Sequence, residues 1–282
     1  MGIAVRTFLA FIILWGLHPP AVAIPPVESG TVSDGVTLFL PMVVRTVPPN
    51  GERSVIGYSV AGRPLEVYRF GYGPRKRLIL GGIHGGYEWN TTALVQQLMD
   101  HTLAHPEIIP ADQTLYFLPT LNPDGLARSH WTQGRANDHN VDINRNFDYN
   151  WKPDWYRIGC WNYLPITAGS GPFSEPEARA LRDFVLGYRI EALISYHSVG
   201  AEIYAGGKPA DPASLDLALT LKRASGYAYP PHSSTCEETG QMIDWASTQG
   251  IAAVDVEMGA FQSVDYAPNE LILNAFLGWS RP

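Results

Sequence analysis

The chain has 282 residues, of which 45% are hydrophobic and 17% are charged. This composition is typical of a folded protein with one large core, and it argues against a long disordered chain. Acidic residues outnumber basic ones by 27 to 20, which gives a formal charge of −7, and no run of Lys and Arg stands out. We therefore expect neither a nucleic acid nor an anionic membrane surface as a partner.

The N-terminus has the pattern of a secretory signal. Arg6 precedes a short apolar run, residues 7–17, and the small residues 21–23 (Ala-Val-Ala) follow. These features indicate a signal peptide over residues 1–23 that is removed by cleavage at its end. A membrane anchor is the alternative, but the apolar run is short for a bilayer span. The sequence thus predicts an exported protein, extracellular or periplasmic, with no membrane attachment after cleavage.

Residues 24–53 are rich in Pro, Gly and Val and predict a leader that is too short to be a domain, followed by one catalytic domain over residues 54–282. In that domain, apolar runs alternate with helical patterns. The predicted strands are residues 77–83, 114–121, 190–196 and 251–256, and the predicted helices are residues 92–101, 174–186, 212–225, 241–249 and 269–279. This alternation indicates an α/β fold in which helices flank a central mixed, largely parallel sheet.

The chain contains two cysteines, Cys160 and Cys236. In an exported protein they are expected to pair, and the bridge would close a long loop. The alternative is two unpaired thiols.

Polar residues follow three of the predicted strands. His84 and Glu88 come after the first strand, His197 follows the third, and Glu257 follows the fourth. Because parallel strands end at one edge of a sheet, these side chains can gather there. Two imidazoles and one carboxylate make a zinc site with an open fourth position. Taken singly, His84 and Glu88 could be exposed surface residues and His197 a hydrogen-bonded core histidine. The prediction of one Zn²⁺ per chain therefore rests on their combination.

Six segments in a fixed order strengthen this interpretation. They are GGIHGGYEWN (81–90), NPDG (122–125), VDINRNF (141–147), ISYHS (194–198), GQMIDW (240–245) and VDVEMG (254–259). Together they resemble the zinc metallocarboxypeptidase family, that of carboxypeptidase A. The likeness extends from residues 59–64 to the last predicted helix, and it implies the fold and the peptide-hydrolysing activity of that family.

The resemblance implies a role for each polar group of the metal site. His84 and His197 match the two histidine ligands, and Glu88 is expected to be the carboxylate ligand. Asp142 matches the carboxylate that orients the imidazole of His84, a contact that would fix its tautomer.

The resemblance also implies the substrate contacts. Glu257 matches the general base that acts on a zinc-activated water, and Arg135 matches the group that polarises the scissile carbonyl. Asn144 and Arg145 match the pair that holds the C-terminal carboxylate, for which a planar guanidinium is well suited. Ile243 matches the floor of the side-chain pocket. The expected substrates are therefore peptides with a free C-terminal carboxylate that end in an apolar or aromatic residue.

Two positions depart from the pattern of the family. The family spaces its first ligand pair as H-x-x-E, and here the fourth position is Tyr87, with Glu88 one residue later. Gly85 and Gly86 would allow the turn to absorb the extra residue. The family also places a tyrosine seven residues before the pocket floor, and this chain has Cys236 there. A hydroxyl that helps bind substrate is thus missing or supplied from elsewhere.

Two other functions remain open. The same zinc chemistry could serve an amidase or peptidase on cell-wall peptides, such as γ-glutamyl-diaminopimelate links. A non-catalytic module that binds zinc or a carboxylate on the same fold is the alternative from another class. The sequence does not determine the oligomeric state.

Overall fold

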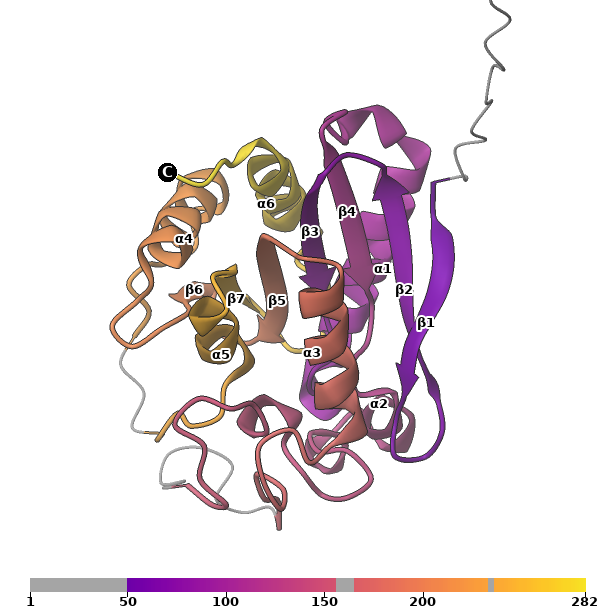
Figure 1. Cartoon of the computed structure of the whole chain (residues 1–282), viewed down its shortest axis with the longest axis vertical. Helices are drawn as coiled ribbons and strands as arrows, with labels where there is room; N and C mark the ends of the chain where they lie inside the picture. Colours follow the sequence, from indigo (N-terminus) through magenta and orange to yellow (C-terminus); the bar gives the residue numbers. More distant parts are fainter. Residues whose placement is uncertain (1–49, 156–164, 233–235) are drawn as a thin grey trace, which may run out of the picture. The chain divides into compact units, whose positions relative to one another are not determined.

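The computed structural model describes residues 50–155, 165–232 and 236–282. The predicted signal peptide, almost all of the predicted leader and Cys160 lie outside these residues, so export and the Cys160–Cys236 bridge remain predictions. Within the described residues, seven strands form one sheet (Figure 1). The strands are β1 (Glu52–Tyr58), β2 (Pro64–Gly71), β3 (Arg75–Leu80), β4 (Gln113–Leu118), β5 (Ala192–Ser198), β6 (Glu202–Ala205) and β7 (Ala252–Met258).

The sheet has the order β1-β2-β4-β3-β5-β7-β6. Its four central strands, β4, β3, β5 and β7, run parallel to one another. The strands β1, β2 and β6 pair antiparallel at the two sides. The predicted mixed, largely parallel sheet is thereby confirmed. Since β3, β5 and β7 are parallel neighbours, the residues that follow them meet at one edge of the sheet.

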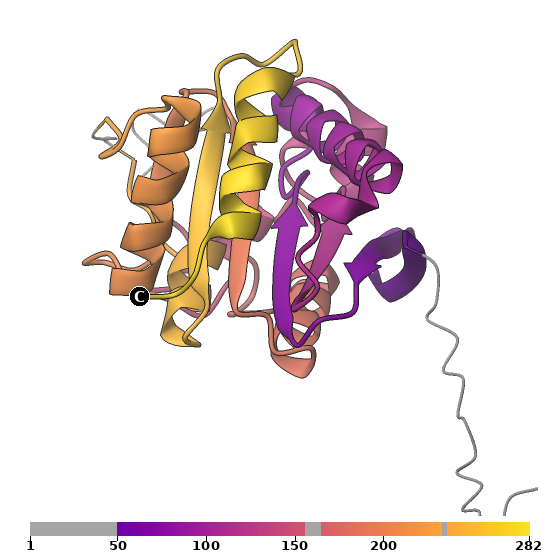
Figure 2. The ribbon, with the colours of Figure 1, turned by 90° about the horizontal axis from the view of Figure 1, so that it is seen from above.

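Helices cover both faces of this sheet (Figures 1 and 2). The helices are α1 (Trp89–Ala104), α2 (Pro123–Arg128), α3 (Pro176–Gly187), α4 (Pro212–Ser225), α5 (Met242–Thr248) and α6 (Tyr266–Gly278), with short 3-10 segments η1 (Gly86–Glu88), η2 (Pro106–Ile108), η3 (Thr132–Gly134) and η4 (Ile143–Arg145). Buried residues of α1, α4 and α6 form one apolar core with the sheet, and those of α3 and α5 form another. None of the helices in the described ranges has the length and apolar character required to cross a membrane.

The four predicted strands are the four parallel ones, each shifted by up to three residues. The helix predicted over residues 212–225 coincides with α4, whereas α6 begins at Tyr266, three residues before its predicted start. The antiparallel strands were not predicted. Most residues of β1 are exposed, so it has no apolar alternation, and β6 has only four residues. Burial on both faces gives the central strands the apolar runs that reveal them.

The NPDG segment does more than turn the chain, because it begins α2. Asn122 caps this helix by accepting a hydrogen bond from the backbone N–H of Gly125 at 2.9 Å. Asp124 is buried and accepts hydrogen bonds from three groups of the β1–β2 connection: the hydroxyl of Ser59 (2.7 Å), the backbone N–H of Ala61 (2.9 Å) and the guanidinium of Arg63 (2.7 Å). Asp124 therefore joins the antiparallel side of the sheet to the loops that carry the polar motifs.

Asp124→Asn tests this connection. Burial alone would raise the pKa of Asp124, but the hydrogen bonds from Ala61, Ser59 and Arg63 outweigh it and lower the pKa below its usual value. A carboxyl whose pKa is lower in the folded state adds stability above its unfolded pKa of about 3.9. This contribution is lost as the pH falls through the folded pKa. We expect the substitution to lower the free energy of unfolding by about 1–3 kcal/mol at pH 7.

Urea unfolding of the metal-free protein at several pH values measures this effect. The difference between wild type and Asp124→Asn should shrink as the pH falls below about 4. Asp183→Asn is the matched control, since the side chain of Asp183 is 66% exposed. A difference that stays constant down to acid pH would contradict the role of the charge.

Candidate metal and peptide-binding site

His84 and Glu88 reach the end of β3 through a tight glycine turn. Gly86 has a φ of +69°, and a Cβ there would lie 2.2 Å from the carbonyl oxygen of Trp131. A Cβ on Gly85 would lie 2.4 Å from the backbone nitrogen of Leu126. The turn continues into η1, which ends at Glu88. The two glycines thus accommodate the extra residue of the H-x-x-x-E spacing, as the sequence predicts.

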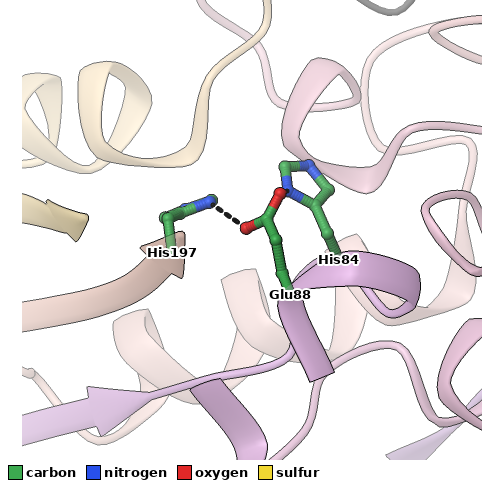
Figure 3. Close-up of side chains that lie close together, drawn as sticks. All are labelled: His84, Glu88 and His197. Atoms are coloured by element: carbon green, nitrogen blue, oxygen red, sulfur yellow. Dashed lines mark hydrogen bonds and ion pairs between the residues drawn. The ribbon is translucent and has the colours of Figure 1, made fainter. Parts of the chain in front are cut away.

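Glu88 lies between the two predicted histidine ligands (Figure 3). Its Oε1 is 2.9 Å from Nδ1 of His84, and its Oε2 is 3.0 Å from Nδ1 of His197. All three side chains are buried, and one ligand atom from each lies within 4.8 Å of the others. Although burial raises the pKa of Glu88, the charge of His84 and the hydrogen bond from His197 lower it below its usual range. The carboxylate is therefore ionised and can bind a cation.

A second carboxylate orients His84. Asp142 lies at the start of η4, and its Oδ1 is 2.9 Å from Nε2 of His84. Burial alone would raise the pKa of Asp142, but the charges of Arg135 and His84 hold it well below the usual value. An ionised carboxylate only accepts hydrogen bonds, so Nε2 carries the proton and Nδ1 faces Glu88. This is the contact that the sequence analysis predicts.

His197 has a similar partner that the sequence analysis missed. Its Nε2 lies 3.1 Å from the hydroxyl of Ser195 and 3.4 Å from Oδ1 of Asp255. Asp255 and Glu257 are two residues apart in β7, so both side chains point to the same face of the sheet. The period of two in VDVEMG could have identified Asp255 beside the predicted base.

These contacts test whether the group fits a zinc ion. The Nε2 of His84 bonds Asp142, the Nε2 of His197 bonds Ser195 and lies 3.4 Å from Asp255, and each Nδ1 faces Glu88. A cation held by Glu88 and the two Nδ1 atoms would leave the contacts of both Nε2 atoms in place. The donor set is also the two-histidine, one-glutamate set of zinc hydrolases. His84, Glu88 and His197 therefore fit zinc.

Glu257 borders the same cavity. Its Oε2 is buried and has no hydrogen-bond partner among the described residues. Burial raises the pKa of Glu257, and the negative charges of Glu88 and Asp255 raise it further, against the positive charge of His197. A carboxylate that is held at raised proton affinity beside a metal-binding group is suited to accept and return a proton.

Arg135 lies against the metal-binding group. Its Nη1 donates to Oε1 of Glu88 at 3.1 Å, and its Nε donates to Oδ2 of Asp142 at 3.0 Å. The guanidinium borders the cavity together with the predicted ligands. Glu88 and Asp142 thus hold the guanidinium of Arg135 at the cavity, as its predicted role of polarising a scissile carbonyl requires.

The predicted carboxylate clamp is also in the cavity. Asn144 accepts a hydrogen bond from the backbone N–H of Met242 at 2.9 Å, which ties η4 to α5. Arg145 is 5% exposed, and its Nη1 donates to the backbone oxygen of Asn144 at 2.9 Å. The Nε of Arg145 is buried and has no hydrogen-bond partner in the described parts of the chain. An anion in the cavity would satisfy this donor.

The cavity has a volume of about 270 Å³. Its lining consists of His84, Glu88, Arg135, Asn144, Arg145, His197, Ser198, Val199, Tyr204, Cys236, Glu238, Gln241, Asp255, Glu257 and Phe261. Eight of the nine predicted site residues are thus in or directly behind one cavity, with Asp142 behind His84.

Ile243 is the exception. It is buried in the apolar core that α3 and α5 share with the sheet, and it is not among the residues that line the cavity. The cavity holds Tyr204 and Asp255 instead. Tyr204 donates a hydrogen bond to Glu202 at 3.1 Å and places a phenol near Cys236, where the family pattern has a tyrosine. The sequence analysis missed Tyr204 because it lies on β6, which was not predicted.

Comparisons with known proteins agree with this geometry. A family profile described as zinc carboxypeptidase matches residues 39–275. Carboxypeptidase B of Astacus astacus is 28% identical over 77% of this chain and 81% of its own length. The structure of thrombin-activatable fibrinolysis inhibitor matches with a TM-score of 0.67 at 21% identity, over 82% of this chain and 69% of that one. Murein-tripeptide amidase of Escherichia coli matches with a TM-score of 0.59 at 24% identity, over 86% of this chain and 98% of that one.

Glu88→Ala tests the third ligand. We expect wild type to bind one zinc ion per chain and the variant to bind it more than about 100-fold more weakly, since even a residue behind a ligand contributes about 10–100-fold. Competition with a chromophoric chelator measures the affinity. Tyr87→Phe is the matched control, because it changes the neighbouring position where the family places its glutamate, and it should bind zinc as wild type does. Equal affinities of Glu88→Ala and wild type would contradict the assignment.

Proposed function

Because this chain belongs to the zinc carboxypeptidase family, we propose that it removes single residues from the C-terminus of peptides. In this proposal His84, Glu88 and His197 hold the zinc ion. The observation that carries the proposal is the buried Arg145, whose Nε lacks a hydrogen-bond partner within the described residues and which borders the same cavity as the metal-binding group.

Arg145 supports cleavage at a chain end. A guanidinium presents two parallel N–H groups, which match the two oxygens of a carboxylate. A peptide carries an α-carboxylate only at its C-terminus, so an internal bond would leave the buried donor unsatisfied. Loss of a hydrogen bond to a buried charged group is costly, and this penalty selects against internal cleavage. The neighbouring amide of Asn144 completes the binding surface.

Zinc bound there would supply Lewis-acid chemistry, which polarises a peptide carbonyl and makes water more acidic. We assign the proton transfers to Glu257. Its carboxylate would take a proton from the attacking water and give it to the leaving amine. Arg135 would stabilise the negative charge that develops on the carbonyl oxygen, and the loss of one such donor typically costs about 10²–10³ in rate. Asp142 and Asp255 would hold the two imidazoles in the required orientation.

The nature of the C-terminal side chain follows from the cavity lining. Ile243, on which the expectation of an apolar residue rests, packs in the core. The cavity instead contains the carboxylate of Asp255, which makes no hydrogen bond through Oδ1 in the described chain and lies 3.4 Å from Nε2 of His197 as an ion pair. The phenol ring of Tyr204 lies in the same lining and can pack against an aliphatic stem. We therefore propose a preference for C-terminal residues with a cationic side chain.

Cell-wall peptides remain the second candidate substrate. A diamino acid at a peptide end offers an ammonium group to Asp255 and a carboxylate to Arg145, so the same cavity would suit it. The fold shared with a murein-tripeptide amidase supports testing this class. Because residues 1–23 are predicted to be a secretory signal, we propose that the enzyme is exported and meets its substrate outside the cytoplasm.

A paired peptide library tests the proposed activity. Residues 24–282 are loaded with zinc, and each peptide is supplied with a free C-terminus and as its C-terminal amide. We expect single residues to be released from the free acids only, and a chelator to stop the release. Mass spectrometry follows the products. Cleavage of the amides at equal rates, or at internal bonds, would contradict the role of Arg145.

Glu257→Gln is the control for this experiment. It should reduce turnover by more than about 100-fold while leaving the zinc content unchanged, since the base contributes to rate and not to metal binding. Muropeptides that end in a diamino acid are assayed beside the linear peptides. Retained zinc binding with no hydrolysis of any substrate by wild type would favour the non-catalytic module.

Asp255→Asn tests the side-chain preference. We expect wild type to release Lys and Arg faster than Phe from matched peptides, and the substitution to reduce this ratio of kcat/KM values by about 10-fold or more, because an ion pair in a buried cavity is lost. The peptide ending in Phe is the internal control, since a disturbance of His197 would slow both substrates equally. An unchanged ratio, or faster release of Phe by wild type, would contradict the proposal.

A further inference from the structure

A second cavity, of about 630 Å³, lies at the opposite edge of the sheet from the metal-binding group. It is bordered by the first residues of β3 and β5 and by the residues just before β7, whereas the metal-binding group lies after the end of β3 and at the last residues of β5. A strand rises about 3.3 Å per residue, so the two sites are roughly 15–20 Å apart. The proposed hydrolysis does not use this cavity.

Positive charge is concentrated there. Four arginines border the cavity, Arg75, Arg77, Arg189 and Arg281, against one carboxylate, Glu191. This contrasts with the formal charge of −7 for the whole chain. Within the described structure, Arg75 forms the ion pairs of this group: it lies 3.2 Å from Asp112 and 3.8 Å from Glu191. Asp112 and Glu191 also act on the charge of Arg77, but no ion pair joins a carboxylate of the described residues to Arg77, Arg189 or Arg281.

Arg77 is the most unusual of the four. It is 1% exposed, and its guanidinium packs over the rings of Phe276 and Trp279 with centroid distances of 5.1 and 5.7 Å. One of its terminal nitrogens donates to the backbone oxygen of Trp279. The other, Nη1, is buried without a hydrogen-bond partner in the described ranges. Burial, followed by the positive charge of Arg75, lowers the pKa of Arg77 to about 10.

A buried guanidinium without an ion-pair partner is rare in folded proteins. An anion in the adjoining cavity would supply both such a partner and an acceptor for Nη1. The backbone at the rim gives independent support. Arg189 has a φ of +55° just after the end of α3, where glycine is usual. A position that favours glycine holds a long cationic side chain at the entrance of an arginine-lined cavity.

We propose that this cavity binds a small organic oxyanion, a phosphate ester or a carboxylate, whose apolar part contacts the remaining walls. Guanidinium groups recognise both oxyanions by paired N–H donors. The apolar walls include Val185, Leu186 and Ile190. The volume is within the range of about 300–1,000 Å³ that is usual for small-molecule sites, so the ligand is larger than a bare inorganic ion.

Phenyl phosphate, benzoate and inorganic phosphate are the probes for this site. Isothermal titration calorimetry of the zinc-loaded protein, at constant ionic strength set with chloride, gives the affinities. We expect phenyl phosphate or benzoate to bind more tightly than inorganic phosphate and to raise the melting temperature. The comparison of the two organic probes decides which oxyanion the cavity prefers. Binding no stronger than that of chloride for all three would overturn the proposal.

Variants separate this site from the candidate peptide-binding site. Arg189→Gln combined with Arg281→Gln changes two exposed arginines at the rim and should weaken binding by about 10-fold or more. Arg77→Met should abolish binding if the variant folds. Arg223→Gln changes an exposed arginine on α4 and should bind as wild type does. Arg145→Gln, which alters the other cavity, should leave this binding intact. Unchanged binding in the rim variant, or loss of binding in Arg145→Gln, would overturn the proposal.

Discussion

The buried carboxylate of Glu88 is the constraint around which this part of the fold is organised. A charge removed from water must be paired and hydrogen-bonded, because otherwise the fold would lose several kcal/mol. Glu88 contacts one imidazole from the turn after β3, one from β5, and a guanidinium from the loop after α2. The turn that delivers it has no room for side chains at Gly85 and Gly86. The strands, the glycine turn and the loop that carries Arg135 must therefore all be in place before this charge is stable.

The two imidazoles that contact Glu88 have carboxylate neighbours of their own. Each imidazole has a carboxylate at its outer nitrogen, Asp142 for His84 and Asp255 for His197. These two acids reach the site from different segments, one from η4 and the other from β7. The negative charge of Asp255 also acts on Glu257, whose pKa is raised chiefly by burial and then by Glu88 and Asp255. The acid beside His197 thereby helps to set the proton affinity of the proposed base.

The sequence was sufficient for those parts of the fold and site that obey local rules. The parallel strands are apolar runs because both their faces are buried, and the polar residues after them must meet at one edge. This rule alone predicts that His84, Glu88, His197 and Glu257 lie together. The roles of Asp142, Arg135 and Arg145 came from the resemblance to a family, since nothing in the spacing of a loop determines where its side chains point.

Ile243, predicted to form the floor of the pocket, packs in the core instead. Its place in the motif GQMIDW is right for the family, but whether a side chain faces a cavity or the core depends on the orientation of α5, which no local pattern encodes. Tyr204 was missed because β6 is too short to carry a periodic signal. Asp255 could have been predicted, because residues two apart in a strand point to the same face, and Asp255 and Glu257 are two apart in β7.

The two charged edges of the sheet raise the question of whether their sites interact. The carboxyl edge carries the metal-binding group and its acids, and the amino edge carries the arginines around Arg77. Their separation of roughly 15–20 Å exceeds the Debye length of about 8 Å at physiological ionic strength, although the protein between them screens less than water does. Direct electrostatic coupling across the sheet is therefore weak. Any coupling would have to pass through the packed strands β3, β5 and β7, and close-packed strands resist small displacements. An anion at Arg77 is thus expected to stabilise the fold, because it pairs with a buried charge. It is not expected to change the proton transfers at Glu257, which depend on residues of the opposite edge.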